Sequence, residues 1–336
     1  MRALFVTDGG PTKPSSRMRV YQVVPRLIDH GIDARILDTT ALPTRLRGRQ
    51  FYRLIVLRQA RQADVVVIQK RLFDAPTLIA LKRANPRLVY DFDDAVFTGP
   101  GDPLGRPVAP AARRLQAVLR LARAVIAGNP TLADYASRYA SCVTVVPTVV
   151  DVAAYRPKCS TATDGPPCIG WAGTANNLVS LEEIRPVLGE VTQRGLARFR
   201  IVSSRRPDWP EFDYDYEHWR AERAIEAIRE FDIGVMPLAD TPWNRGKCGF
   251  KTIEYMALGL PAVASPVGVL TEIVKDGKNG FLAASPEDWA SILRRLAGNA
   301  SLRVSAGLAG RATVERRYSL DSAVPKIAAV LSAVGG

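Results

Sequence analysis

Short, almost wholly apolar runs alternate with helical stretches along the chain, and this alternation constrains the fold more than any other feature. A strand that is apolar at nearly every position is covered on both faces, as in a parallel sheet between two layers of helices. We therefore predict an α/β fold of parallel strand–helix units. The predicted strands are residues 3–7, 65–69, 88–90, 124–127, 143–146, 168–172, 199–203, 233–237 and 262–264.

The chain length predicts two domains, because 336 residues exceed what one compact core usually holds. Residues 157–167 (PKCSTATDGPP) lack periodicity and are rich in Ser, Thr, Gly and Pro, which is typical of a linker. The strand–helix alternation restarts after them. We predict a first Rossmann-like domain at residues 1–157 and a second at residues 158–317.

Helical spacing of apolar residues predicts further elements. Residues 16–30 have one apolar face, but Pro25 predicts a kink or a late start. Ser285 and the Pro and two acids after it mark a helix start. A last helix is expected near residues 322–333.

Composition excludes several classes of protein. No run approaches the ~20 apolar residues that a membrane span needs, and the first residues read as a strand rather than a signal peptide. We therefore expect a cytoplasmic protein. Four Cys without a CxxC pair and only two His argue against a metal site, so we expect no metal and incidental thiols.

The whole net charge of +13 lies in the first half. Residues 1–158 hold 25 Lys and Arg against 12 Asp, whereas residues 159–336 hold 21 charges of each sign. This asymmetry indicates an anionic partner for the first half. Codon bias toward Arg is the alternative, since Arg outnumbers Lys 37 to 9.

A basic segment with an apolar face could be the part that meets this partner. Residues 45–61 interleave six Arg with Leu, Phe, Ile and Val, a composition suited to the inner face of an anionic membrane. A helix packed on the first sheet with a basic outer face explains the same pattern. Peripheral membrane binding is thus one of two expectations.

The most informative segment is residues 245–265 (RGKCGFKTIEYMALGLPAVAS). A basic loop leads into a short helix at about residues 252–258, and a helix start with free N–H groups favours a phosphate. Gly249 lets the backbone approach closely, and Arg245, Lys247 and Lys251 supply charge. Glu254 could accept hydrogen bonds from ribose hydroxyls. The alternative is a solvated basic loop that caps a packed helix.

This segment resembles the donor-binding motif of the retaining GT-B glycosyltransferases of the family 4 type. Those enzymes carry two glutamates eight positions apart, followed by a GLPVVAS-type run; here Glu254, residues 259–268 and residues 272–281 match. The first glutamate falls on Gly246. A Lys-Cys-Gly-Phe-Lys variant, with Phe250, stands in its place, which puts the usual role of that glutamate in doubt.

The resemblance extends upstream and implies further donor-binding residues. Residues 168–177 resemble the first strand and turn of a donor domain, with Gly173 at the turn. Trp171 stands near the place where relatives have a diphosphate-binding arginine. The missing cations could come from Arg205 and Arg206, or from the basic loop.

The first half resembles an acceptor domain more loosely. Gly10 lies in a glycine turn after the first strand, and Arg17 and Arg19 open the next helix, where they could face an anion. Asp91, Asp93 and Asp94 follow a parallel strand at the edge where ligands bind. We expect Asp93 or Asp94 to face the acceptor; the alternative is capping of the next helix. Asp91-x-Asp93 also matches the metal-binding pair of GT-A glycosyltransferases, which have a different fold.

The resemblance implies a retaining, hexosyltransferase-type enzyme with a UDP- or GDP-sugar donor and a glycan or lipid-linked acceptor, and no nucleic acid partner. It implies no cofactor and no metal, with Lys247 and Asp93 as catalytic residues and residues 318–336 as a helix that crosses back to the first domain. A GT-B nucleotide-sugar epimerase and a non-catalytic nucleotide-sugar binder remain as alternatives.

Overall fold

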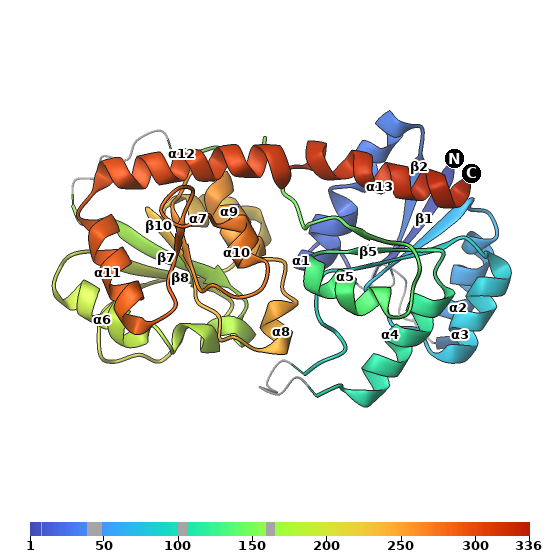
Figure 1. Ribbon diagram of the computed structural model, residues 1–336, viewed down its shortest axis with the longest axis horizontal. Coiled ribbons are helices and arrows are strands. Elements are labelled where there is room, and N and C mark those ends of the chain that lie inside the picture. The colour runs from blue at the N-terminus through green and yellow to red at the C-terminus, as the bar shows by residue number, and fades with distance from the viewer. Residues whose placement is uncertain (8, 39–48, 100–105, 159–164) are drawn as a thin grey trace. The chain divides into compact units, whose positions relative to one another are not determined.

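The computed structural model describes residues 1–7, 9–38, 49–99, 106–158 and 165–336, which form two compact units (Figure 1). Unit 1 comprises Met1–Val149, Thr241–Cys248 and Leu320–Gly336, and unit 2 comprises Val150–Asp240 and Gly249–Ser319. Residues 150–157, which we assigned to the first domain, group with unit 2 because Val150 and Tyr155 are buried in its core. Most of the predicted linker lies outside the described residues.

The described residues of unit 1 form a six-stranded parallel sheet in the order β2-β1-β3-β4-β5-β6. Five strands confirm the predicted runs, with small shifts at their ends: β1 (Arg2–Thr7), β3 (Val65–Gln69), β4 (Leu88–Phe92), β5 (Ala124–Ala127) and β6 (Val143–Val145). The sixth, β2 (Asp33–Asp38), has no apolar run and is not among the predicted strands.

Helices cover both faces of this sheet. Val56, Leu81, Leu115 and Leu132 pack on one face from α2 (Arg49–Ala60), α3 (Ala75–Ala84), α4 (Ala109–Leu121) and α5 (Pro130–Ser137). The 3-10 helix η2 (Val24–His30) and α13 (Leu320–Gly335) pack on the other. The C-terminal helix is therefore part of unit 1.

The stretch around Pro25 is not one straight helix. The chain passes through α1 (Pro14–Ser16) and a π-helical segment, η1 (Arg17–Tyr21), before η2 begins with Pro25 in its first turn. The ring of Pro25 has no N–H to donate, so the helix restarts there. The sequence predicts a kink or a late start at Pro25, and the structure shows a helix that is interrupted and restarts there.

The described residues of unit 2 also form a six-stranded parallel sheet, in the order β12-β11-β10-β7-β8-β9. Four strands confirm the predicted runs: β7 (Cys168–Gly173), β8 (Arg198–Ser203), β10 (Ile233–Met236) and β11 (Ala262–Ala264). The edge strands β9 (Asp215–His218) and β12 (Phe281–Leu282) are not among the predicted strands. The two predicted Rossmann-like sheets are thus both present.

Two layers of helices enclose the unit 2 sheet. The 3-10 helix η4 (Ala175–Leu181), α6 (Arg185–Gln193) and α11 (Pro286–Ala297) contribute to one core. The other core contains residues of α7 (Ala224–Arg229), α9 (Phe250–Ala257), α10 (Leu270–Ile273) and α12 (Ala300–Arg317). Helix α11 begins at the predicted Ser285 with a full capping box to Asp288. None of the helices in the described residues is long and apolar enough to cross a membrane.

Two contacts of Tyr255 fix helix α9 against β10 and the carboxyl end of β7. Gly234 of β10 leaves room for the Tyr255 ring, because a Cβ at this glycine would overlap that ring. The Ala172 N–H donates a hydrogen bond to the Tyr255 hydroxyl at 3.1 Å. The carboxyl end of β7 and helix α9 are thereby held in a defined relation.

Candidate functional site

The loop before α9 is shaped by a glycine that no other residue can easily replace. Gly249 precedes α9 at a φ of 66°, in the left-handed region, and a Cβ there would lie 2.5 Å from Ile273 Cδ1. The helix begins without a side-chain cap at this position. Its first-turn N–H groups and its dipole therefore favour an anion at this end.

A cation lies beside the end of β7. Lys251 Nζ stands 5.3 Å from the centroid of the Trp171 ring, and a Cβ at Gly173 would lie 2.6 Å from Lys251 Cε. The lysine side chain thus runs across Gly173 and is oriented by a fully buried tryptophan. The structure brings three predicted donor-site residues, Gly173, Gly249 and Lys251, to one end of the unit 2 sheet.

Glu254 is a buried carboxylate with a defined orientation. Only 8% of the residue is exposed, and its Oε1 accepts a hydrogen bond from the Tyr155 hydroxyl at 2.8 Å. A buried carboxylate is stable only with such partners. The sequence does not single out Tyr155, because it precedes the matched motif by almost one hundred residues.

The other predicted donor-site residues of unit 2 have packing or surface positions in this structure. Phe250 is partly buried against the unit 2 core, which gives it a packing role. Arg205 follows β8 and is exposed to solvent, while Arg206 stacks on Tyr214 at 5.3 Å. Lys251, rather than these two arginines, supplies a cation beside Trp171.

In unit 1 the carboxylates at the carboxyl end of β4 are neutralised by cations: Asp91 lies in the strand, and Asp93 and Asp94 follow it. Arg19 donates two hydrogen bonds to Asp91, at 2.6 and 2.7 Å, and a third to the Val146 carbonyl at 3.1 Å. Burial alone would lower the pKa of Arg19, but the charge and hydrogen bonds of Asp91 outweigh it and raise this pKa above its ordinary value. Arg19 is therefore paired with Asp91, and it connects β4 to Val146, the residue after β6, at the carboxyl end of the sheet.

A second cation, Lys70, joins the two remaining carboxylates. Its ammonium is hydrogen-bonded to Asp94 and lies 3.4 Å from Asp93 Oδ1. The Ser15 hydroxyl lies 2.6 and 2.7 Å from the two oxygens of Asp93. Sequence reasoning missed Lys70 as a site residue, although its position directly after the strand 65–69 is a usable signal.

These contacts divide the three carboxylates by accessibility and by pKa. The Asp94 side chain is 29% exposed, against 10% for Asp93 and 6% for Asp91. Burial and the charge of Asp93 raise the pKa of Asp94. Burial opposes ionisation of Asp93, but Lys70 and Arg19 lower its pKa. Asp94 is thus the most accessible of the three carboxylates.

The segment 241–248, which carries Arg245 and Lys247, packs within unit 1. Asn129 Nδ2 donates to the carbonyls of Gly246 and Lys247 at 2.9 and 3.0 Å, and the Cys248 thiol donates to the Asp93 carbonyl at 3.2 Å. Burial lowers the pKa of Lys247, and the charge of Asp94 opposes this effect. Arg245 is exposed. The predicted donor-site residues therefore fall into both units.

Gly246 occupies the position of the missing glutamate for a steric reason. A Cβ at Gly246 would lie 2.5 Å from the Ala95 Cβ and 3.1 Å from the Ala95 nitrogen. A larger residue cannot keep this contact. The glutamate of the related motif and this packing are mutually exclusive.

The remaining predicted acceptor-side residues have ordinary structural contacts. Gly10 is buried, and its carbonyl accepts a hydrogen bond from the Lys13 N–H at 3.0 Å. Arg17 is half-buried at the start of η1. Across the part of the chain that the structure describes, no three His, Cys, Asp or Glu residues gather as metal ligands.

Comparisons with known proteins agree with this architecture. Residues 168–299 match the family described as Glycosyl transferases group 1. A D-inositol 3-phosphate glycosyltransferase from Nocardioides sp. is 44% identical over 68 residues, which are 20% of this chain and 15% of that enzyme.

Solved structures match over nearly the whole chain. The crystal structure of Anabaena Alr3699/HepE in complex with UDP and glucose has a TM-score of 0.72 at 16% identity, with 99% of each chain covered. Sucrose-phosphate synthase from Thermosynechococcus elongatus has a TM-score of 0.75 at 13% identity, again with 99% of each chain covered.

The fold is therefore that of the GT-B glycosyltransferases, as predicted. Within it, residues 168–299 match the model of the group 1 glycosyltransferase family. The GT-A alternative for Asp91 and Asp93 does not fit, because the fold differs and both oxygens of Asp91 are bonded to Arg19.

Proposed function

We propose that the protein transfers a sugar from a nucleoside diphosphate to an acceptor hydroxyl, with retention of configuration and without a bound metal. The observation that carries this proposal is the placement of Lys251 beside Trp171 and Gly173, one residue into the uncapped helix α9. A lysine and a helix N-terminus together suit a diphosphate. This arrangement lies inside the segment that matches the group 1 family.

We propose UDP as the first nucleotide to test, because the Anabaena Alr3699/HepE crystals contain UDP or UDP-glucose. In this proposal Glu254 accepts hydrogen bonds from the ribose hydroxyls, and its hydrogen bond with Tyr155 limits its rotation. Gly173, Gly249 and the half-buried Phe250 shape the pocket. Arg205 and Arg245, both exposed, add positive charge for the anionic donor.

For catalysis we propose that Lys247 stabilises the negative charge that develops on the departing diphosphate. On the acceptor side we propose Asp94 as the carboxylate nearest to the acceptor hydroxyl, with Asp93 oriented behind it by Ser15 and Lys70. The acceptor side of the proposed site further includes Gly10, Arg17, Arg19 and Asp91. The acceptor class that we propose is a glycan or a lipid-linked glycan.

A donor screen tests the proposal. Thermal unfolding is followed with UDP, GDP and their glucose derivatives, and UDP release from UDP-glucose is then measured with an acceptor pool, with and without excess EDTA. A specific nucleotide at 100 times its dissociation constant should stabilise the protein by about 2.7 kcal/mol. We expect release that depends on acceptor and survives EDTA.

The outcomes separate the alternatives. Stabilisation without release under any acceptor condition would indicate a binder, and conversion of the nucleotide sugar to an isomer would indicate an epimerase. Activity that disappears with EDTA and returns with Mn²⁺ would contradict the metal-free chemistry.

A further inference from the structure

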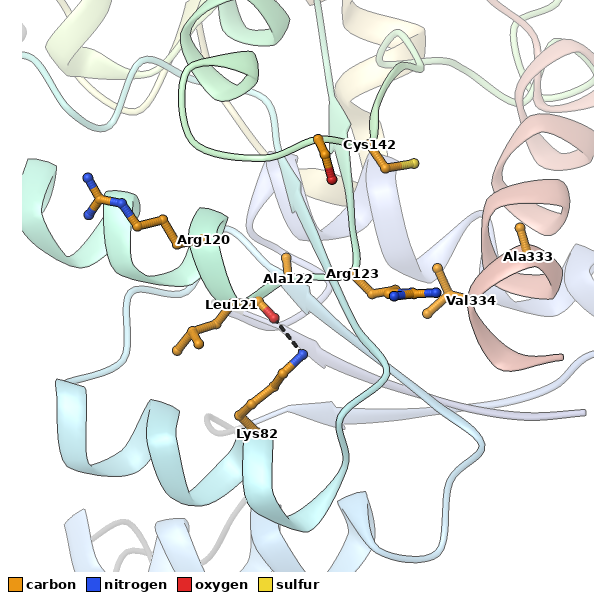
Figure 2. A pocket seen from close by; sticks show the side chains of 9 residues that line it. Lys82, Arg120, Leu121, Ala122, Arg123, Cys142, Ala333 and Val334 are labelled. Atoms are coloured by element: carbon orange, nitrogen blue, oxygen red, sulfur yellow. Dashed lines mark hydrogen bonds between the residues drawn. The ribbon is translucent and has the colours of Figure 1, made fainter.

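A basic groove of about 570 Å³ lies on unit 1, away from the carboxylates described above (Figure 2). It is lined by the ends of α3, α4 and α13 and by the residues that precede β5 and β6. It therefore lies at the amino ends of the strands, whereas Asp91 and Asp94 lie at the carboxyl ends. Three of its nine lining residues, Lys82, Arg120 and Arg123, are cationic, and none of the nine is acidic.

Lys82 is held in place by the backbone. Its ammonium donates hydrogen bonds of 2.8 Å to the carbonyls of Leu121 and Pro86, the first of which is drawn in Figure 2. An ammonium has three N–H donors, so one N–H remains for a ligand. Burial and the nearby charge of Arg123 lower the pKa of Lys82.

Arg123 brings a second charge without a counter-charge. Its side chain is exposed and extends toward Val334 in the groove (Figure 2). Among the described residues, no carboxylate forms an ion pair with its guanidinium. Arg120 stands at the rim, stacked on Tyr139 at 4.9 Å. Two neighbouring cations repel each other, and an anion between them removes that repulsion.

We propose that this groove binds a phosphate group through the Lys82 ammonium and the Arg123 guanidinium, independently of the donor site. The planar fork of an arginine matches the oxygens of a phosphate, and a fixed lysine adds a point charge. A free phosphate ester and the headgroup of an anionic lipid share this chemistry. The proposal does not depend on sugar transfer, because the groove lies at the amino ends of the unit 1 strands and the acceptor-side carboxylates lie at the carboxyl ends.

Cys142 provides a local reporter, since it lines the groove and is exposed, whereas Cys168 and Cys248 are buried. The full chain carries Cys159→Ser, so that Cys142 is the thiol to be alkylated. The rate of its reaction with iodoacetamide is measured against inorganic phosphate at constant ionic strength. At about ten times the dissociation constant the rate should fall about tenfold, because only the unoccupied groove reacts.

Matched variants locate the effect. Arg123→Gln should abolish the protection, whereas Arg114→Gln, which removes an exposed charge from α4 outside the groove, should retain it. Phosphatidylglycerol and phosphatidylcholine vesicles form the second arm. Protection by phosphatidylglycerol vesicles alone would identify a lipid headgroup as the ligand, and protection by inorganic phosphate a free phosphate.

Three results would overturn the proposal: no protection in either arm, equal protection by chloride, or full protection in Arg123→Gln. UDP binding, measured on the same variants, should be unchanged, so a failed donor proposal and a failed groove proposal give different results.

Discussion

At the scale of single residues, the backbone is strained at one position directly after β3, where a lysine places its charge at the carboxyl end of the unit 1 sheet. Lys70 is the non-glycine residue with a positive φ, 57°, among those that the structure describes. This conformation costs roughly 1–2 kcal/mol for a residue with a side chain. The ammonium that it places between Asp93 and Asp94 offsets that cost. The strained backbone therefore indicates that the position of the Lys70 ammonium is important for the function of this site.

Asp94 should also control the protonation of Lys247. Burial lowers the pKa of Lys247 and the charge of Asp94 raises it, so Asp94→Asn should lower this pKa further. If charged Lys247 is required for turnover, the alkaline limb of the pH–rate profile for UDP release should move to lower pH. Asp134→Asn, a charge loss on α5, is the control. An unshifted limb in Asp94→Asn would show that Lys247 does not act as a catalytic cation.

At the scale of elements, the segment 241–248 is fitted to unit 1 by small residues. Gly246 meets Ala95, and Gly128 leaves room for Cys248, whose sulfur would lie 2.5 Å from a Cβ at that glycine. Hydrogen bonds from Asn129 complete the contact. The position of Lys247 is therefore set by packing in unit 1 rather than by helix α9.

This packing predicts a rescue between two substitutions. Gly246→Ala should destabilise unit 1 by about 1–3 kcal/mol through overpacking against Ala95, and Ala95→Gly in the same chain should recover most of the loss. Thermal unfolding measures both. Gly298→Ala, where a Cβ would lie 3.6 Å from the Arg294 carbonyl oxygen, is the matched control. Equal melting temperatures for Gly246→Ala and the native chain would refute the steric explanation for the missing glutamate.

How far the sequence predicts these elements depends on where each one lies. The central strands are predicted because both faces are buried, as in β3, where every residue is buried. The strands β2, β9 and β12 lie at sheet edges, and β9 (DYEH) is polar and partly exposed, so no apolar run marks it. Likewise, the motif predicts Lys251 and Glu254 as donor-site residues. Lys70 could not be predicted in this way, because it meets Asp94 only through the pairing of β3 with β4.

At the scale of the whole molecule, the charge asymmetry coincides with exposed apolar side chains. Helix α2 packs on the sheet through Tyr52 and Val56, while Phe51 and Leu54 are 56% and 63% exposed. Arg45 and Arg47 of the basic segment lie outside the described residues. We therefore propose that unit 1 binds an anionic membrane surface through α2, as a basic helix with an exposed apolar stripe can do.

Vesicle binding of the full chain tests this surface. Phosphatidylglycerol vesicles should bind, phosphatidylcholine vesicles should not, and binding should weaken steeply with salt. Replacing Phe51 and Leu54 by Ser should weaken binding about tenfold or more, because their apolar burial is lost. The same change at Val179 and Leu308, exposed in unit 2, is the control. Binding that does not depend on lipid charge or on salt would contradict this proposal, and codon bias would then explain the excess of Arg in the first half.

Above all, we propose that unit 2 binds the nucleotide of a sugar donor through α9 and Glu254. Isothermal titration of UDP into the native chain, Glu254→Gln and the exposed control Glu226→Gln tests it directly. A charge-assisted hydrogen bond contributes roughly 1.5–3 kcal/mol, so Glu254→Gln should weaken UDP binding about tenfold or more, with Glu226→Gln unchanged. Unaltered UDP affinity in Glu254→Gln, with a lowered melting temperature, would contradict the claim and assign Glu254 to packing.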